Sequence, residues 1–267
     1  MSTDPRWFIH VVPCTGLGHG ADMRYSTLLL ALIAQPALAE LPAPVTDADY
    51  PPIVKQEAVL GRDLFYDPIL SGNLNVACAT CHNPAFGTSD GLSLGIGDGG
   101  IGLGTSRVID PENLPEARVP RNSPALFNLG ASEFTRLFHD GRIEVDANRP
   151  GGIRTPLADD MVAGFASLLS AQTMFPVLSP DEMAGHYAEN DVSKAVRQGL
   201  LTGPGGAWDI IAKRVAAVPA YADRFAKVYP DRPEIGFTDI ANALAAFMAW
   251  EWRSDTSLFD EVLRGQA

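Results

Sequence analysis

Two cysteines three positions apart, with a histidine directly after the second, constrain this chain more than any other feature. They are Cys78, Cys81 and His82, in the run Cys-Ala-Thr-Cys-His. Two thiols on one helical turn can form thioether bonds with the two vinyl groups of a haem, and the next residue then offers its imidazole to the haem iron. The motif therefore predicts one covalently attached haem c, with His82 as the proximal ligand of the iron.

Cys-x-x-Cys also occurs in zinc sites, in disulfides and in redox dithiols. A structural zinc site normally takes four protein ligands, and the chain has no second cysteine pair, since its third cysteine is Cys14. A redox dithiol of the thioredoxin kind belongs to a βαβ unit, and no such pattern surrounds this motif. The histidine that follows favours haem over these alternatives.

An export signal precedes the motif. Met23-Arg24-Tyr25 begins a short charged region, residues 28–34 are nearly all aliphatic, and Ala37-Leu38-Ala39 gives the small-x-small cleavage pattern. The apolar run is shorter than the roughly 20 residues that a membrane-spanning helix needs. We predict that residues 23–39 are a signal peptide cleaved after Ala39, which directs the mature chain to the periplasm without a membrane span.

Residues 1–22 fit no part of such a signal. We interpret them as a mis-assigned upstream extension, with a long signal region or a disordered tail as the alternatives. Residues 40–267 would then form a single haem domain. The formal net charge of the whole chain is -12, from 20 basic and 32 acidic residues. An acidic surface argues against nucleic-acid binding and is compatible with a basic protein partner.

Helical periodicity dominates the rest of the chain. Apolar side chains recur at helical spacing over residues 53–66, where Pro52 suits the first helical position and Asp67-Pro68 a stop. The motif itself is expected in a short helix within residues 71–82. Further helices are expected at 191–201, 206–217, 220–228, 238–252 and 256–264.

Several local signals mark the expected helix ends and loops. Ser179-Pro180-Asp181-Glu182 indicates a capping box that opens a helix, Thr238 indicates an N-cap and Gly265 a helix stop. The glycine-rich stretch from Gly87 to Gly104 predicts an irregular loop. No alternating strand pattern is convincing. The expected fold class is mainly α, a cytochrome c-like haem domain with long irregular loops.

The surroundings of the motif resemble a known family. The segment 60–72 leads into the motif, which is followed directly by Asn83-Pro84. Further along the chain come Arg121-Asn122-Ser123-Pro124-Ala125-Leu126 and Phe138-His139-Asp140-Gly141-Arg142. Over most of residues 50–264 the chain resembles the N-terminal haem domain of bacterial di-haem cytochrome c peroxidases, including methylamine-utilisation-type relatives. The resemblance implies that this haem reacts with hydrogen peroxide. It also implies that a second haem passes on electrons from a small donor protein, a cytochrome or a cupredoxin, and that Asn122 contacts a calcium ion.

The chain departs from the family pattern at several positions. It holds no second Cys-x-x-Cys-His, so a second haem domain or a partner chain would have to supply the second haem. Asp98 stands where the resemblance places a displaceable distal histidine, Leu137 stands in place of a glutamine, and Ala147 in place of an acid. A truncated product that does little is therefore one alternative.

Peroxide cleavage at haem requires a general base beside the iron. We nominate Glu144 first and Asp146 second, because a carboxyl group in an apolar haem pocket can have its pKa raised. Arg142 is the first candidate for binding the haem propionates, ahead of Arg107, Arg118 and Arg121, because a guanidinium pairs well with a carboxylate.

The remaining candidate ligands point to another alternative, a mono-haem electron carrier with a methionine as sixth ligand. Met161, Met174 and Met183 are its candidates, with Met248 placed on a core stripe. His186 is expected at the surface, and His139 as a structural aromatic residue.

The expected function of the chain, ahead of these alternatives, is peroxidase-like reduction of hydrogen peroxide.

Overall fold

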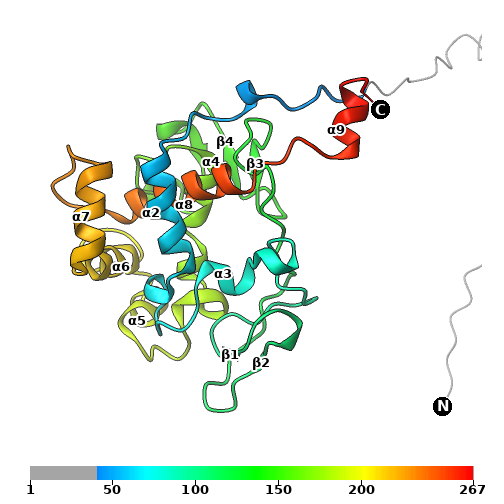
Figure 1. Cartoon of the computed structure of the whole chain (residues 1–267). Helices are drawn as coiled ribbons and strands as arrows, with labels where there is room; N and C mark the ends of the chain where they lie inside the picture. The colour runs from blue at the N-terminus through cyan, green and yellow to red at the C-terminus, as the bar shows by residue number, and fades with distance from the viewer. Residues whose placement is uncertain (1–40, 267) are drawn as a thin grey trace, which may run out of the picture. The chain divides into compact units, whose positions relative to one another are not determined.

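The computed structural model describes residues 41–266 (Figure 1). The predicted upstream extension at 1–22, the signal peptide at 23–39 and its cleavage site lie outside these residues. Pro44–Ala267 forms one compact unit. Within residues 41–266, no helix combines the length and the apolar character needed to cross a bilayer.

Helices make up most of the regular structure, which confirms the mainly α prediction. The α-helices are α2 (Lys55–Tyr66), α3 (Cys78–Cys81), α4 (Leu168–Thr173), α5 (Asp191–Arg197), α6 (Ala207–Ala216), α7 (Pro219–Val228), α8 (Phe237–Glu251) and α9 (Leu258–Leu263). All but α4 coincide with predicted helices, most of them one to four residues shorter. Helix α2 begins at Lys55 with Val54 as its N-cap, so Pro52 lies outside it. It ends at Tyr66 with Asp67 as its C-cap, as predicted.

Five short strands were not predicted. β1 (Gly100–Ile101) pairs antiparallel with β2 (Val108–Ile109), and β4 (Ile143–Val145) lies between β3 (Arg136–Leu137) and β5 (Ile153–Arg154). Each strand has only two or three residues, which is too short for an alternating pattern to stand out in the sequence.

Two of three predicted helix ends differ from the prediction. The N-cap of α8 is Gly236, whose N–H donates to the Asp239 carboxylate at 2.9 Å, so the Thr238 prediction was wrong. The segment after Ser179 is a single π-helical turn, Pro180–Ala184, because Gly185 leaves the helix with a φ of 92°. Gly265 follows α9 with a φ of 68°, as expected of a helix stop.

Helices α2 and α8 pack side by side at the centre of the unit (Figure 1). The core between them is built from Leu60, Leu64 and Phe65 of α2 and from Leu244 and Phe247 of α8, all 2% exposed or less. Gly61 allows the close approach, since a Cβ there would overlap the Ala243 carbonyl group. This contact fixes the helix that precedes the haem motif against the helix that faces it.

Replacing Gly61 by alanine is expected to lower the free energy of unfolding by about 3 kcal/mol. Alanine is the better helix former by about 1 kcal/mol, but the overlap is with backbone, which cannot rotate away as a side chain can. Urea unfolding of the haem-loaded chain measures the change. Gly199→Ala is the control: the space around that glycine is open, so we expect only the cost of backbone strain at a φ of 71°, about 1 kcal/mol. Equal stabilities of Gly61→Ala and wild type would contradict the packing argument.

Candidate functional site

The two cysteines of the motif lie on one turn, as predicted. Helix α3 consists of Cys78–Cys81, and the His82 N–H closes it by donating to the Cys78 carbonyl at 2.9 Å. Both thiols are free. The helix therefore presents two sulfur atoms one turn apart and an imidazole directly after them.

Burial keeps both thiols protonated. It raises the pKa of Cys78 to about 12, helped by the charge of Cys81, and it raises the pKa of Cys81 to about 11 against the opposing effect of Arg107. Reactive redox dithiols have a lowered pKa instead. The environment thus disfavours the dithiol alternative and suits thiols that end as thioethers.

His82 has the tautomer that an iron ligand needs. Its Nδ1 lies 3.0 Å from the Thr88 carbonyl oxygen, which can only accept, so Nδ1 carries the proton. The Nε2 lone pair is then available to a metal, and the hydrogen bond fixes the ring orientation. Burial lowers the pKa of His82, which keeps the ring neutral. Ser123 Oγ lies 3.3 Å from Nε2.

An apolar cavity adjoins these residues. Its volume is about 60 Å³. Apart from the motif, the lining is aliphatic or aromatic with two polar exceptions, and comprises Phe65, Leu126, Leu129, Leu169, Gln172, Thr173, Pro176, Leu244 and Met248. Such a lining suits the hydrocarbon face of a porphyrin, so the residues fit a covalently attached haem.

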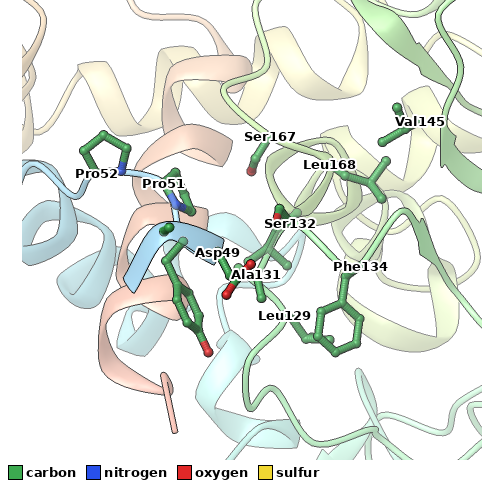
Figure 2. A pocket seen from close by; sticks show the side chains of 14 residues that line it. Asp49, Pro51, Pro52, Leu129, Ala131, Ser132, Phe134, Val145, Ser167 and Leu168 are labelled. Atoms are coloured by element: carbon green, nitrogen blue, oxygen red, sulfur yellow. The ribbon is translucent and has the colours of Figure 1, made fainter. Parts of the chain in front are cut away.

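A second, wider groove, whose lining is shown in Figure 2, has a volume of about 460 Å³ by the same measure. Tyr50, Phe134 and Val145 contribute to its lining, and Leu129 and Leu169 line both spaces. We assign the attachment of the haem to the first cavity, because Cys78 and His82 line it.

The predicted acid–base residues do not line the cavity. Glu144 lies on β4 and binds Arg136 of β3 at 2.8 Å and Arg154 of β5 at 2.6 Å. These hydrogen bonds lower the pKa of Glu144, contrary to the expected rise. Asp146 accepts a hydrogen bond from the Asn148 N–H at 3.0 Å in a local turn. The catalytic role of both residues stays a prediction.

Glu182 has the raised pKa that was expected of Glu144, although it too is absent from the lining of the cavity. Burial raises its pKa to about 7, with a smaller rise from Asp181 and opposing effects from Ser179 and Arg142. Its charge also raises the pKa of Cys81, so the carboxyl group lies within electrostatic reach of the motif. The sequence analysis assigned Glu182 to a capping box. The signal in the sequence that was missed is an acid directly before two apolar residues, Met183 and Ala184, which are buried in the structure.

Gln172 was also missed, because it lies in an otherwise apolar run. It stands on α4 and is the one side-chain amide among the residues that line the cavity. An amide can both donate and accept hydrogen bonds. Gln172 could therefore orient a small polar molecule next to the haem.

The other predicted binding residues have partners of their own. Arg142 Nε donates to Asp140 at 2.9 Å, and its guanidinium lies 5.0 Å from the centre of the Phe138 ring. Asn122 Nδ2 donates to the Leu92 carbonyl at 2.5 Å. In residues 41–266, no group of three or more His, Cys, Asp or Glu residues is arranged to hold a metal ion, so calcium at Asn122 rests on the resemblance alone.

The histidine and methionine candidates fall into clear groups. The surface prediction for His186 was wrong, since its side chain is fully buried, whereas His139 is exposed. Met174 and Met183 are buried in the core. Met248 lines the cavity together with His82, which the prediction of a core stripe did not foresee.

A short helix with two cysteines, a neutral histidine with its Nδ1 engaged and an apolar cavity are the features of a c-type haem protein. A family model described as di-haem cytochrome c peroxidase matches residues 55–267, and the chain belongs to this family. The family identifies the cofactor as c-type haem, in agreement with the motif.

Curated relatives agree with the family. The chain is 29% identical over 196 residues to methylamine utilization protein MauG of Methylorubrum extorquens, which covers 73% of this chain and 38% of the relative. It is 31% identical over 253 residues to MauG of Paracoccus denitrificans, and the aligned region covers 90% of this chain and 52% of the relative. It is 27% identical over 228 residues to cytochrome c551 peroxidase of Pseudomonas aeruginosa, and the aligned region covers 84% of this chain and 47% of the relative. The chain thus spans about half or less of the length of these relatives.

Among solved structures, a MauG-like protein associated with microbial copper homeostasis matches with a TM-score of 0.46 and 24% identity. The match covers 86% of this chain and 49% of that one.

Proposed function

We propose that this chain is a periplasmic, peroxidase-like haem protein that reduces hydrogen peroxide with electrons from a small redox protein. Cys78 and Cys81 would hold one haem c by thioether bonds, and His82 would bind its iron. The bound haem would supply the redox-active iron for the reaction. One observation carries the proposal: an apolar cavity lined by Cys78 and His82, with Glu182, a carboxyl group of raised pKa, in electrostatic reach of Cys81.

Glu182 would act as the acid–base group. Reduction of one hydrogen peroxide to two waters takes two electrons and two protons, and one proton must move from one peroxide oxygen to the other. The Glu182 carboxylate would accept that proton and return it, because a pKa near 7 makes both directions accessible at neutral pH. The Gln172 amide would orient the peroxide. Glu144 and Asp146 are the alternatives from the sequence.

The electrons would come from outside the chain. A small donor protein, a cytochrome or a cupredoxin, would supply them through a second haem domain or a partner chain that carries the second haem. The length of the curated relatives, about twice that of the aligned region, supports this arrangement. A calcium ion at Asn122 and haem propionates at Arg142 belong to the same proposal.

A second candidate function is electron transfer by a mono-haem cytochrome. Met248 favours it, because its thioether lines the cavity that contains His82. A methionine as sixth ligand raises the reduction potential and leaves no open position for peroxide.

Spectroscopy of the haem-loaded chain, produced with haem-attachment machinery, distinguishes the two functions. We expect one haem per chain by mass, and a high-spin ferric spectrum that changes when hydrogen peroxide is added. A low-spin spectrum that ignores peroxide and becomes high-spin in Met248→Leu would instead establish the electron carrier. Met183→Leu is the control, since Met183 lies in the core away from the cavity lining.

A further inference from the structure

The glycine-rich loop after the haem motif is tied to the turn that carries Glu182. The Asp98 N–H donates to the Glu182 carbonyl oxygen at 2.9 Å. The preceding residue, Gly97, lies so close to this turn that a Cβ would overlap the carbonyl oxygens of Asp181 and Glu182. Because the φ of Gly97 is outside the left-handed region, glycine is required there by space alone.

Arg107 holds the same loop from within. Its guanidinium is buried, and it donates to the carbonyl oxygens of Ile96 at 2.6 Å, Gly97 at 2.5 Å and Gly102 at 2.7 Å. In the part of the chain that the structure describes, Arg107 makes no ion pair. All three guanidinium nitrogen atoms thus donate hydrogen bonds to the backbone of the loop. The planar, rigid guanidinium group of arginine suits these three directions better than the flexible ammonium group of lysine.

Asp98 connects the loop to the segment that precedes the motif. Its Oδ1 accepts a hydrogen bond from Asn75 Nδ2 at 2.6 Å, and its Oδ2 accepts one from Asn73 Nδ2 at 3.1 Å. Oδ2 also faces His186 Nε2 at 3.6 Å, and both side chains are fully buried. Three segments that are far apart in the sequence, 73–75, 96–98 and 180–184, therefore meet at Asp98.

We infer that Gly97, Asp98 and Arg107 are positioning residues for Glu182: they hold the backbone of the turn 180–184 and thereby keep the Glu182 carboxyl group within electrostatic reach of Cys81. The inference rests on the proposed function of Glu182. It also gives Asp98 a task in this chain, namely to join three backbone segments rather than to line the haem cavity.

Gly97→Ala tests the inference with the smallest change. The new methyl group must push the turn away, because it meets two carbonyl oxygens that belong to the backbone. We expect the amides of Asp98, Met183 and Ala184 to exchange hydrogen at least about 10-fold faster, with α2 and α8 unchanged and the haem content unaltered. Unchanged exchange at these amides would overturn the inference.

The second measurement is the rate of the peroxide reaction against pH. The groups that act electrostatically on Glu182 are Ser179 and Asp181 on its own turn, Arg142 after β3 and Cys81 on α3. Asp98 and His186 are the titratable groups that contact the turn from neighbouring segments. When the turn loosens, Glu182 gains solvent, so we expect the midpoint near pH 7 to move down towards the ordinary range of a glutamate. More of the carboxylate is then ionised at neutral pH, but it is no longer held in place, so we expect the rate on the plateau above the midpoint to fall about 10-fold or more. A wild-type rate and midpoint in Gly97→Ala would also overturn the inference.

Two further variants complete the experiment. Arg107→Lys keeps the positive charge but loses the guanidinium group and its three hydrogen bonds to the loop. If Gly97→Ala does not fold, Arg107→Lys should show the same faster hydrogen exchange at Asp98, Met183 and Ala184. Gly265→Ala, at the end of α9, adds backbone strain at a φ of 68° in open space; it controls for general loosening and should leave both measurements unchanged. If the wild-type chain does not react with peroxide at all, the proposed function fails, whereas the hydrogen-exchange measurement still decides whether these residues hold the turn.

Discussion

Replacing Glu182 by glutamine is expected to slow the reaction of the haem-loaded chain with hydrogen peroxide by about 10²–10⁴-fold, the usual contribution of a general acid–base group. Glutamine keeps the size of the side chain and its ability to form hydrogen bonds, but it cannot take up and return a proton. The haem spectrum and the haem content should stay as in the wild type. Stopped-flow measurement of the peroxide-dependent spectral change gives the rate.

The pH dependence of this reaction has a definite sign. Burial raises the pKa of Glu182 from 4.5 to about 7, so the carboxylate, which is the proton acceptor, increases as the pH rises through 7. The wild-type rate should therefore rise between about pH 6 and pH 8 and then level off. The Glu182→Gln rate should stay flat over the same interval.

The same shift affects folding stability. In the folded chain the neutral form of Glu182 is favoured, so its contribution is fully present below pH 4.5 and is lost as the pH rises through 7. The shift corresponds to roughly 3 kcal/mol, and less where solvent reaches the carboxyl group. The difference in unfolding free energy between wild type and Glu182→Gln should therefore decrease from pH 4.5 to pH 7.

Glu144→Gln is the matched control for Glu182→Gln. It removes the same charge, but from a carboxylate that Arg136 and Arg154 bind on the three-stranded sheet. We expect a rate within about 3-fold of the wild type. A slow Glu144→Gln together with a normal Glu182→Gln would reject our assignment and restore the one made from the sequence.

The contrast between these two acids shows what the sequence could reveal. The environment of Glu144 depends on strand pairing, because Arg136 and Arg154 stand opposite it on β3 and β5. Strands of two or three residues leave no periodic signal, so these partners could not be foreseen. Glu182 is defined by non-local packing as well, since the loop around Gly97 covers its turn.

Features that depend on neighbouring residues were predicted well. The apolar period of α2 placed a helix within two residues of its observed start, and Cys78 and Cys81 lie on one turn as their spacing required. His186 shows where local reasoning failed. Gly185, at a φ of 92°, ends the turn before the helix could carry His186 to the surface, and the chain then turns the ring into the interior.

Replacement of both Cys78 and Cys81 by alanine is expected to abolish covalent haem attachment. No thiol then remains in the predicted mature chain, so the mass of the denatured protein should equal that of the polypeptide alone. His82 and the apolar cavity remain, and haem should still bind reversibly. Each single variant should keep one thioether. Ala79→Ser, which changes a residue between the cysteines, should keep both.

Dilution separates attached haem from reversibly bound haem. A reversible ligand at 100 times its dissociation constant stabilises the folded state by about 2.7 kcal/mol, and this contribution disappears as the free ligand is removed. The double variant should therefore lose its Soret band and much of its resistance to unfolding on gel filtration, whereas the wild type should lose neither. The opposite outcome has a clear meaning. A wild-type chain made with the attachment machinery that carries zinc, or no added mass at all, would show that the raised pKa values of the two thiols describe an ordinary buried pair rather than a haem site.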